Sequence, residues 1–134
     1  MATERVTRRT AAARTHGLLA AVLLLAPGTV FAADCDRAIR ATNTVASLGE
    51  QAFLAQNYVD GGNLASSARI PAIDAARAAK ECGCTDALQP LEDAQINAAR
   101  ANAVINADAT RSYGARIRDG ARRALEALGK CSAQ

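Results

Sequence analysis

Histidine and aromatic residues are nearly missing from this sequence. It contains one histidine, no tryptophan, two tyrosines and two phenylalanines. Most hydrolytic and transfer chemistry at neutral pH relies on histidine or a metal ion, and the one histidine, His16, lies in the N-terminal segment described next. The sequence also lacks a phosphate-binding loop and a Cys-x-x-Cys-His haem motif. We therefore expect neither an enzyme nor a protein with a cofactor.

The N-terminal segment has the organisation of a secretory signal peptide. Four arginines precede an apolar run over residues 18–26, which is about half of the roughly twenty residues that a membrane-spanning helix needs. The sequence Val30-Phe31-Ala32 then matches a signal-peptidase site, with cleavage after Ala32 or, as the alternative, after Ala33. We expect the mature protein to be periplasmic or secreted, with no membrane anchor.

Removal of residues 1–32 leaves a chain with no net charge. Four of the sixteen basic residues and one of the thirteen acidic residues belong to the leader, so residues 33–134 hold twelve of each. A near-neutral protein has no electrostatic basis for binding nucleic acid or an anionic membrane surface. The length of the mature part fits a single domain.

Alanine and other small apolar residues recur at helical spacing through residues 33–134. Four such stripes predict an all-α fold: a small Ala-rich up-and-down bundle of four helices, or of three with the last one long. The first helix is expected to end before a turn at Asp60-Gly61-Gly62-Asn63. The second is expected to be an irregular lead-in and then a helix over 71–81, because Pro71 disfavours helical geometry at the preceding residue.

The last two stripes raise the question of whether they form one helix or two. One ends at Ile105 and the next begins at Ile117, twelve residues later, which at about 100° per residue turns the apolar face by roughly 120°. We therefore expect a break between residues 107 and 112. The basic segment 111–130 is expected to pair with the acidic segment 85–108, and a basic patch for an acidic partner is the alternative.

Four cysteines carry most of the functional information. In an up-and-down bundle Cys35, Cys82, Cys84 and Cys131 all lie at one end. In an exported protein this predicts two disulfides that join Cys35 and Cys131 each to one of Cys82 and Cys84, because a Cys82–Cys84 bond would close a very small ring. The residues do not decide between the two pairings. A four-sulfur metal site and a thiol-redox pair are alternatives that use the same atoms.

Protein binding is the function class that these observations favour. Export, a cross-linked scaffold and the lack of catalytic or cofactor motifs suggest a chaperone-like, inhibitor, immunity or assembly factor with an unknown protein partner, as a monomer or a homodimer. The contact surface is expected at the end opposite the cysteines, where the scarce large side chains gather: Phe53, Tyr58, Val59, Leu64 and Tyr113. As the alternative, these side chains close that end of the bundle. A periplasmic thiol-redox or metal-handling protein is the competing function class.

Overall fold

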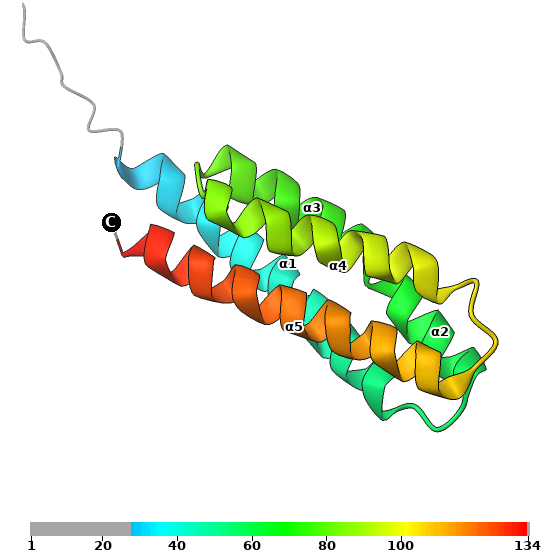
Figure 1. Cartoon of the computed structure of the whole chain (residues 1–134). Helices are drawn as coiled ribbons and strands as arrows, with labels where there is room; N and C mark the ends of the chain where they lie inside the picture. The colour runs from blue at the N-terminus through cyan, green and yellow to red at the C-terminus, as the bar shows by residue number, and fades with distance from the viewer. Residues whose placement is uncertain (1–27, 134) are drawn as a thin grey trace, which may run out of the picture.

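The structure is a computed structural model that describes residues 28–133 (Figure 1). In this part the chain forms only helices: α1 (Gly28–Leu54), α2 (Tyr58–Ser67), α3 (Arg69–Glu81), the 3-10 turn η1 (Thr85–Ala87), α4 (Leu88–Ala101) and α5 (Ala107–Ser132). Most of the predicted leader lies outside the described residues, and its last five residues, 28–32, begin α1. The all-α prediction is confirmed.

Four arms run up and down to form the bundle (Figure 1). The arms are α1, the pair α2–α3, α4 and α5. Helices α1 and α4 each pack against both α3 and α5, so the arms form a square with α1 and α4 on one diagonal. The connections 55–57 and 102–106 lie together at one end, where α2 contacts α1, α4 and α5. The predicted four-helix bundle is confirmed, with its second arm divided in two.

The bundle is built from two halves, residues 35–82 and 84–131, that repeat one pattern. The offset is 49 residues, the distance in sequence from Cys35 to Cys84. Asn57 and Asn106 are equivalent, and each caps the following helix with its side-chain oxygen. Equivalent positions are buried in both halves: Ala38 and Ala87, Val45 and Ala94, Ala52 and Ala101, Gly61 and Thr110, Ala65 and Gly114, Ala68 and Ile117, Ala72 and Ala121, Ala75 and Ala124, Ala79 and Leu128. The fold is therefore a tandem pair of helical hairpins.

The predicted turn at residues 60–63 is wrong. The chain turns earlier, at residues 55–57, and α2 passes through both glycines. A Cβ at Gly61 would lie 2.7 Å from Cγ2 of Thr110, which is its equivalent in the other half. Gly61 thus permits close contact between α2 and α5, and packing explains a glycine that sequence reasoning assigned to a turn.

The irregular lead-in expected before Pro71 is helical instead. Residues 58–67 form α2, and the break between α2 and α3 falls at Ala68. Proline lacks the N–H that would bond to the carbonyl of Ser67, and its ring crowds that carbonyl. In the second half the equivalent of Pro71 is Gly120, and α5 continues through it without a break.

The break expected between residues 107 and 112 lies earlier, at residues 102–106. Asn106 accepts hydrogen bonds from the backbone N–H groups of Asp108 and Ala109 at 2.8 and 3.2 Å, and so fixes the start of α5 at Ala107. Ile105 was expected in the third buried stripe but lies in this connection with 84% of its surface exposed. Residues 86–130 therefore form two helices with an exposed apolar connection.

The expected ion pairing between α4 and α5 is replaced by pairing with α1, and among the described residues the acidic and basic segments are joined only within α5, by Asp108 and Arg111 at 3.8 Å. In the described part of the chain no ion pair joins α4 to α5; Arg118 and Arg122 instead contact Glu50 at 3.2 and 3.8 Å. Arg118 also donates to Asp119 at 2.9 Å. The hydrogen bonds to Asp119 and then to Glu50 raise the pKa of Arg118 above its ordinary value, so its charge persists at every accessible pH.

Candidate functional site

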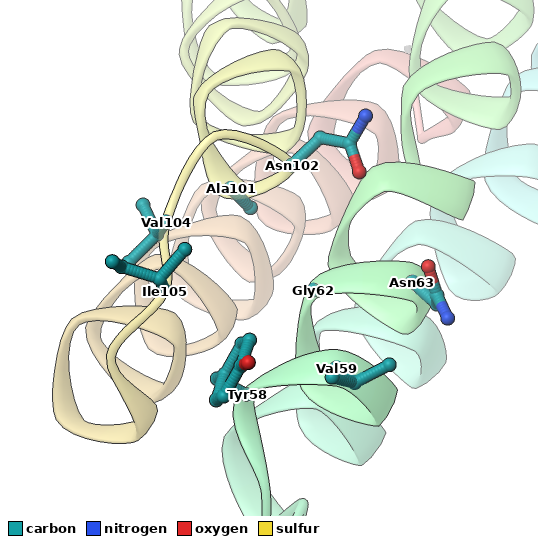
Figure 2. A pocket seen from close by; sticks show the side chains of 8 residues that line it. All are labelled: Tyr58, Val59, Gly62, Asn63, Ala101, Asn102, Val104 and Ile105. Atoms are coloured by element: carbon teal, nitrogen blue, oxygen red, sulfur yellow. The ribbon is translucent and has the colours of Figure 1, made fainter.

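A cavity of about 200 Å³ opens at the end of the bundle opposite the cysteines (Figure 2). One wall is the start of α2, and the other is the end of α4 with the connection that follows it. The lining residues are Tyr58, Val59, Gly62, Asn63, Ala101, Asn102, Val104 and Ile105. Each half of the molecule thus contributes one wall.

Helix caps place the two walls. Asn57 accepts from the backbone N–H of Asp60 at 2.9 Å, and its amide donates to the Asp60 carboxylate at 2.7 Å, so α2 begins at Tyr58. On the other side Asn106 holds the start of α5, which leaves the short connection 102–106 to bridge α4 and α5. Val104 and Ile105 are in this connection and therefore lie beside α2.

The rim of the cavity carries large apolar side chains exposed to solvent. Ile105 and Val59 are 84% and 53% exposed. The carboxamides of Asn63 and Asn102 make no hydrogen bond within the described residues. The site therefore offers apolar contact area together with uncommitted polar groups, which is the composition typical of a binding surface.

The structure divides the five predicted contact residues into two groups. Tyr58 and Val59 line the cavity. Leu64 and Tyr113 are partly buried against the core. Phe53 lies under the guanidinium of Arg118, whose carbon is 4.9 Å from the ring centroid, and stays partly exposed. Part of the set closes the end of the bundle, and part faces the cavity.

Sequence reasoning missed the second wall of the cavity. Ile105 was taken as the continuation of a buried stripe, Asn63 was assigned to a turn, and Val104 and Asn102 were not considered. One signal could have found this wall: the cysteine spacing repeats at an offset of 49 residues, Cys35 to Cys84, and the same offset relates Asn57, which caps α2, to Asn106. That repeat predicts an exposed connection at residues 102–106 to match the one at 55–57.

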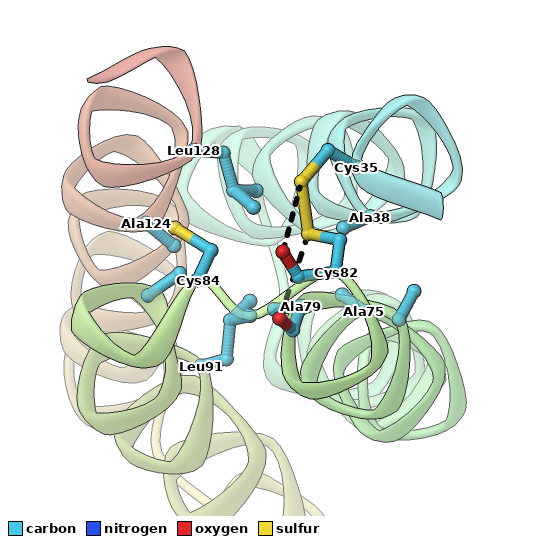
Figure 3. Packing of buried hydrophobic residues seen from close by; sticks show 11 residues of the cluster. Cys35, Ala38, Ala75, Ala79, Cys82, Cys84, Leu91, Ala124 and Leu128 are labelled. Atoms are coloured by element: carbon cyan, nitrogen blue, oxygen red, sulfur yellow. Dashed lines mark hydrogen bonds between the residues drawn. A yellow bond between two sulfur atoms is a disulfide. The ribbon is translucent and has the colours of Figure 1, made fainter. Parts of the chain in front are cut away.

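The four cysteines form two disulfides, Cys35–Cys82 and Cys84–Cys131. Figure 3 shows the first of them. This is one of the two pairings that the sequence left open. Each bond closes one half of the molecule, and Gly83, with φ of +79°, forms the turn between them. Two disulfides indicate an oxidising, extracytoplasmic environment.

The sulfur atoms lie inside the bundle end, against Leu91, Ala124 and Leu128 (Figure 3). Cys35, Cys82 and Cys84 are buried and Cys131 is half-buried. Among residues 28–133 no three His, Cys, Asp or Glu side chains gather as a metal site, and every cysteine is in a disulfide. None of the helices described is long and apolar enough to span a bilayer.

We compared the chain with protein-family models, with curated protein sequences and with solved structures, and none of the three comparisons gives a match. The function is therefore argued from the residues and their geometry.

Proposed function

We propose that this chain is an exported, non-catalytic protein, periplasmic or secreted, that binds another protein through the end of its bundle opposite the disulfides. One observation carries the proposal: the exposed apolar side chains of Val59 and Ile105 line a cavity. Clusters of exposed apolar groups around a concave site are typical of protein contacts.

The composition of the chain makes this cluster significant. Large apolar residues are scarce, and alanine fills most of the core. Burying the side chain of Ile105 in a core would stabilise the fold by roughly 1.5–3 kcal/mol. Its place in the connection 102–106, where it adds little to folding, is explained if a partner covers it.

The disulfides have a supporting role in this proposal. Each disulfide closes one half of the molecule at the opposite end of the bundle, which stiffens that half and lowers the entropic cost of presenting a surface. The alternative, a thiol-redox or metal-handling protein, would need Cys35, Cys82, Cys84 or Cys131 to be exposed as thiols. Nothing in the geometry favours that alternative, because three of the four residues are buried.

The test uses an exposed isoleucine at the site and a matched isoleucine elsewhere. Tagged protein is recovered from the periplasm as wild type, as Ile105→Asp and as Ile96→Asp; Ile96 lies on α4 and is 48% exposed. We expect a partner protein with the wild type and with Ile96→Asp, and its loss with Ile105→Asp. A set of co-purifying proteins that is the same for all three would contradict the proposal.

A further inference from the structure

The cavity has an equivalent place in the other half of the molecule. It lies between α2 of the first half and the connection 102–106 of the second. At the offset of 49 residues that relates Cys35 to Cys84, the equivalent place lies between the start of α5 and the connection 55–57. The two places are built from equivalent parts of the chain and differ in their side chains.

Arg111 occupies the equivalent place. Its Nε donates to the carbonyl oxygen of Ala55 at 3.3 Å, and its Nη1 lies 3.8 Å from Oδ1 of Asp108. The side chain thus reaches from α5 to the α1–α2 connection. At the same offset the residue equivalent to Arg111 is Gly62, and the residue equivalent to Ala55 is Val104. The cavity therefore lies beside Gly62, which has no side chain, whereas Arg111 fills the equivalent place in the other half.

Packing within the bundle does not require a glycine at position 62. A Cβ there would meet the carbonyl oxygen of Ala101 at 3.6 Å, an ordinary contact, and the backbone is helical. Gly61 differs, because its Cβ would lie 2.7 Å from Thr110. A glycine inside a helix is less stable than an alanine. Gly62 therefore keeps the cavity open at the expense of helix stability.

We propose that the cavity receives an arginine side chain of the partner protein, seated as Arg111 is seated in the equivalent place. The Val104 carbonyl matches the acceptor that Arg111 uses, and no side chain in the described residues donates to it. The carboxamide oxygens of Asn63 and Asn102 add acceptors for a guanidinium, which has five donors and no acceptor. Tyr58 lines the same cavity (Figure 2), and an aromatic ring can bind a cation.

This inference rests on the proposed function and adds the chemistry of the partner. Val59 stands where the second half has Asp108, so no carboxylate balances the incoming charge. A guanidinium alone is therefore expected to bind weakly. The apolar rim, above all Ile105, supplies the remaining contact to the chain that carries the arginine.

A separate protein accounts for the site better than a second copy of this chain. Four helices, each about 10 Å across, give the end of the bundle a face of roughly 400 Å². Each subunit of a stable dimer buries about 800 Å². Two copies that meet end to end would bury too little, whereas a partner segment can insert a side chain and continue along α2.

The first experiment is an NMR titration of the oxidised protein with N-acetyl-L-argininamide and with N-acetyl-L-leucinamide. We expect the arginine derivative to bind about tenfold more tightly, because leucine cannot make the charge-assisted hydrogen bonds. The amide shifts should centre on residues 58–63 and 101–105. Equal binding of the two compounds, no binding, or shifts centred elsewhere would overturn the proposal.

Three variants sharpen the titration. Arg111→Gly should open the equivalent place, so that the arginine derivative also shifts amides near Ala55. Gly62→Arg should fill the cavity from within and abolish the response at residues 58–63. Gly129→Arg is the matched control, because Gly129 is a helical glycine with nothing within 4 Å of its Cβ position. Undiminished binding to a folded Gly62→Arg protein would count against the proposal.

The partner assay separates failure of this inference from failure of the proposed function. Loss of the partner with both Ile105→Asp and Gly62→Arg, and its retention with Gly129→Arg, supports both. Loss with Ile105→Asp alone leaves the proposed function standing and overturns the arginine site. If the co-purifying proteins do not depend on Ile105, the proposed function fails, and the titration still decides whether the cavity binds a guanidinium.

Discussion

Gly49 on α1 and Gly114 on α5 face each other at a contact between the two backbones. A Cβ at Gly49 would lie 3.0 Å from the carbonyl oxygen of Gly114, and a Cβ at Gly114 would lie 2.9 Å from the carbonyl oxygen of Gly49. At the offset that relates the halves, the corresponding pair is Ala98 and Ala65. Helices α1 and α5 thus have glycines where their counterparts have alanines, and they leave no room for a methyl group.

We predict that Gly114→Ala destabilises the fold. The added Cβ would lie 2.5 Å from the backbone nitrogen of Phe53 and would push α1 and α5 apart. Overpacking of this kind lowers the free energy of unfolding by about 1–3 kcal/mol, measured by urea denaturation. Gly129→Ala is the control, since its Cβ meets nothing within 4 Å, and it should raise stability by about 0.5–1 kcal/mol. Similar effects at the two positions would refute the steric explanation.

The two disulfides should contribute equally to stability. Each joins residues with a sequence separation of 47, for which restriction of the unfolded chain contributes about 4 kcal/mol. The loops do not overlap, so the effects should add. We expect Cys35→Ala/Cys82→Ala and Cys84→Ala/Cys131→Ala to lose similar amounts in urea denaturation. A difference of more than about 1 kcal/mol would show that native-state packing, and not loop entropy, dominates.

The native protein should not react with alkylating reagents before reduction. Both disulfides are formed and three of the four cysteines are buried, so no thiolate is available. We expect an intact mass that begins at Ala33 and is four hydrogens lighter than the reduced form, with labelling only after reduction. Alkylation without reduction would point to a thiol function for Cys35, Cys82, Cys84 and Cys131.

The ion pairs of Arg118 should be insensitive to alkaline pH. A raised pKa in the folded state stabilises the fold below that pKa, and the contribution is lost only as the pH rises through it. Arg118→Gln should therefore cost about 1 kcal/mol, unchanged between about pH 7 and pH 10. Arg123→Gln, at an arginine without an ion pair in the described chain, should cost close to nothing. A cost for Arg118→Gln that shrinks as the pH rises would contradict this account.

Helical periodicity predicts much of the core. Leu91, Ala94 and Ala98 lie at helical spacing in the stripe that ends at Ile105, Ile117, Ala121 and Leu128 lie at helical spacing in the last stripe, and all six are buried. These positions obey the 3.6-residue period because the bundle buries one face of each arm. The arrangement of the cysteines at one end followed from counting arms.

Periodicity failed where contacts between distant residues decide the local structure. Gly61 and Gly62 predict a turn in isolation, but the close approach of Thr110 places Gly61 inside a helix. Ile105 continues a stripe by spacing, yet the cap at Asn106 places it in a connection. The missing side chain at Gly62 marks the cavity only when Gly62 is compared with Arg111, its equivalent at the offset of 49 residues.

Gly83 alone joins two covalent rings, residues 35–82 and residues 84–131, each closed by its own disulfide. A protease that cuts once within residues 35–82 or 84–131 leaves a molecule whose pieces remain joined, because each ring is closed by its own disulfide. Only a cut beside Gly83, which is exposed between Cys82 and Cys84, divides the molecule into its two hairpins. In electrophoresis without reductant, a single cut between Cys35 and Cys131 therefore leaves the apparent mass unchanged unless the cut falls beside Gly83.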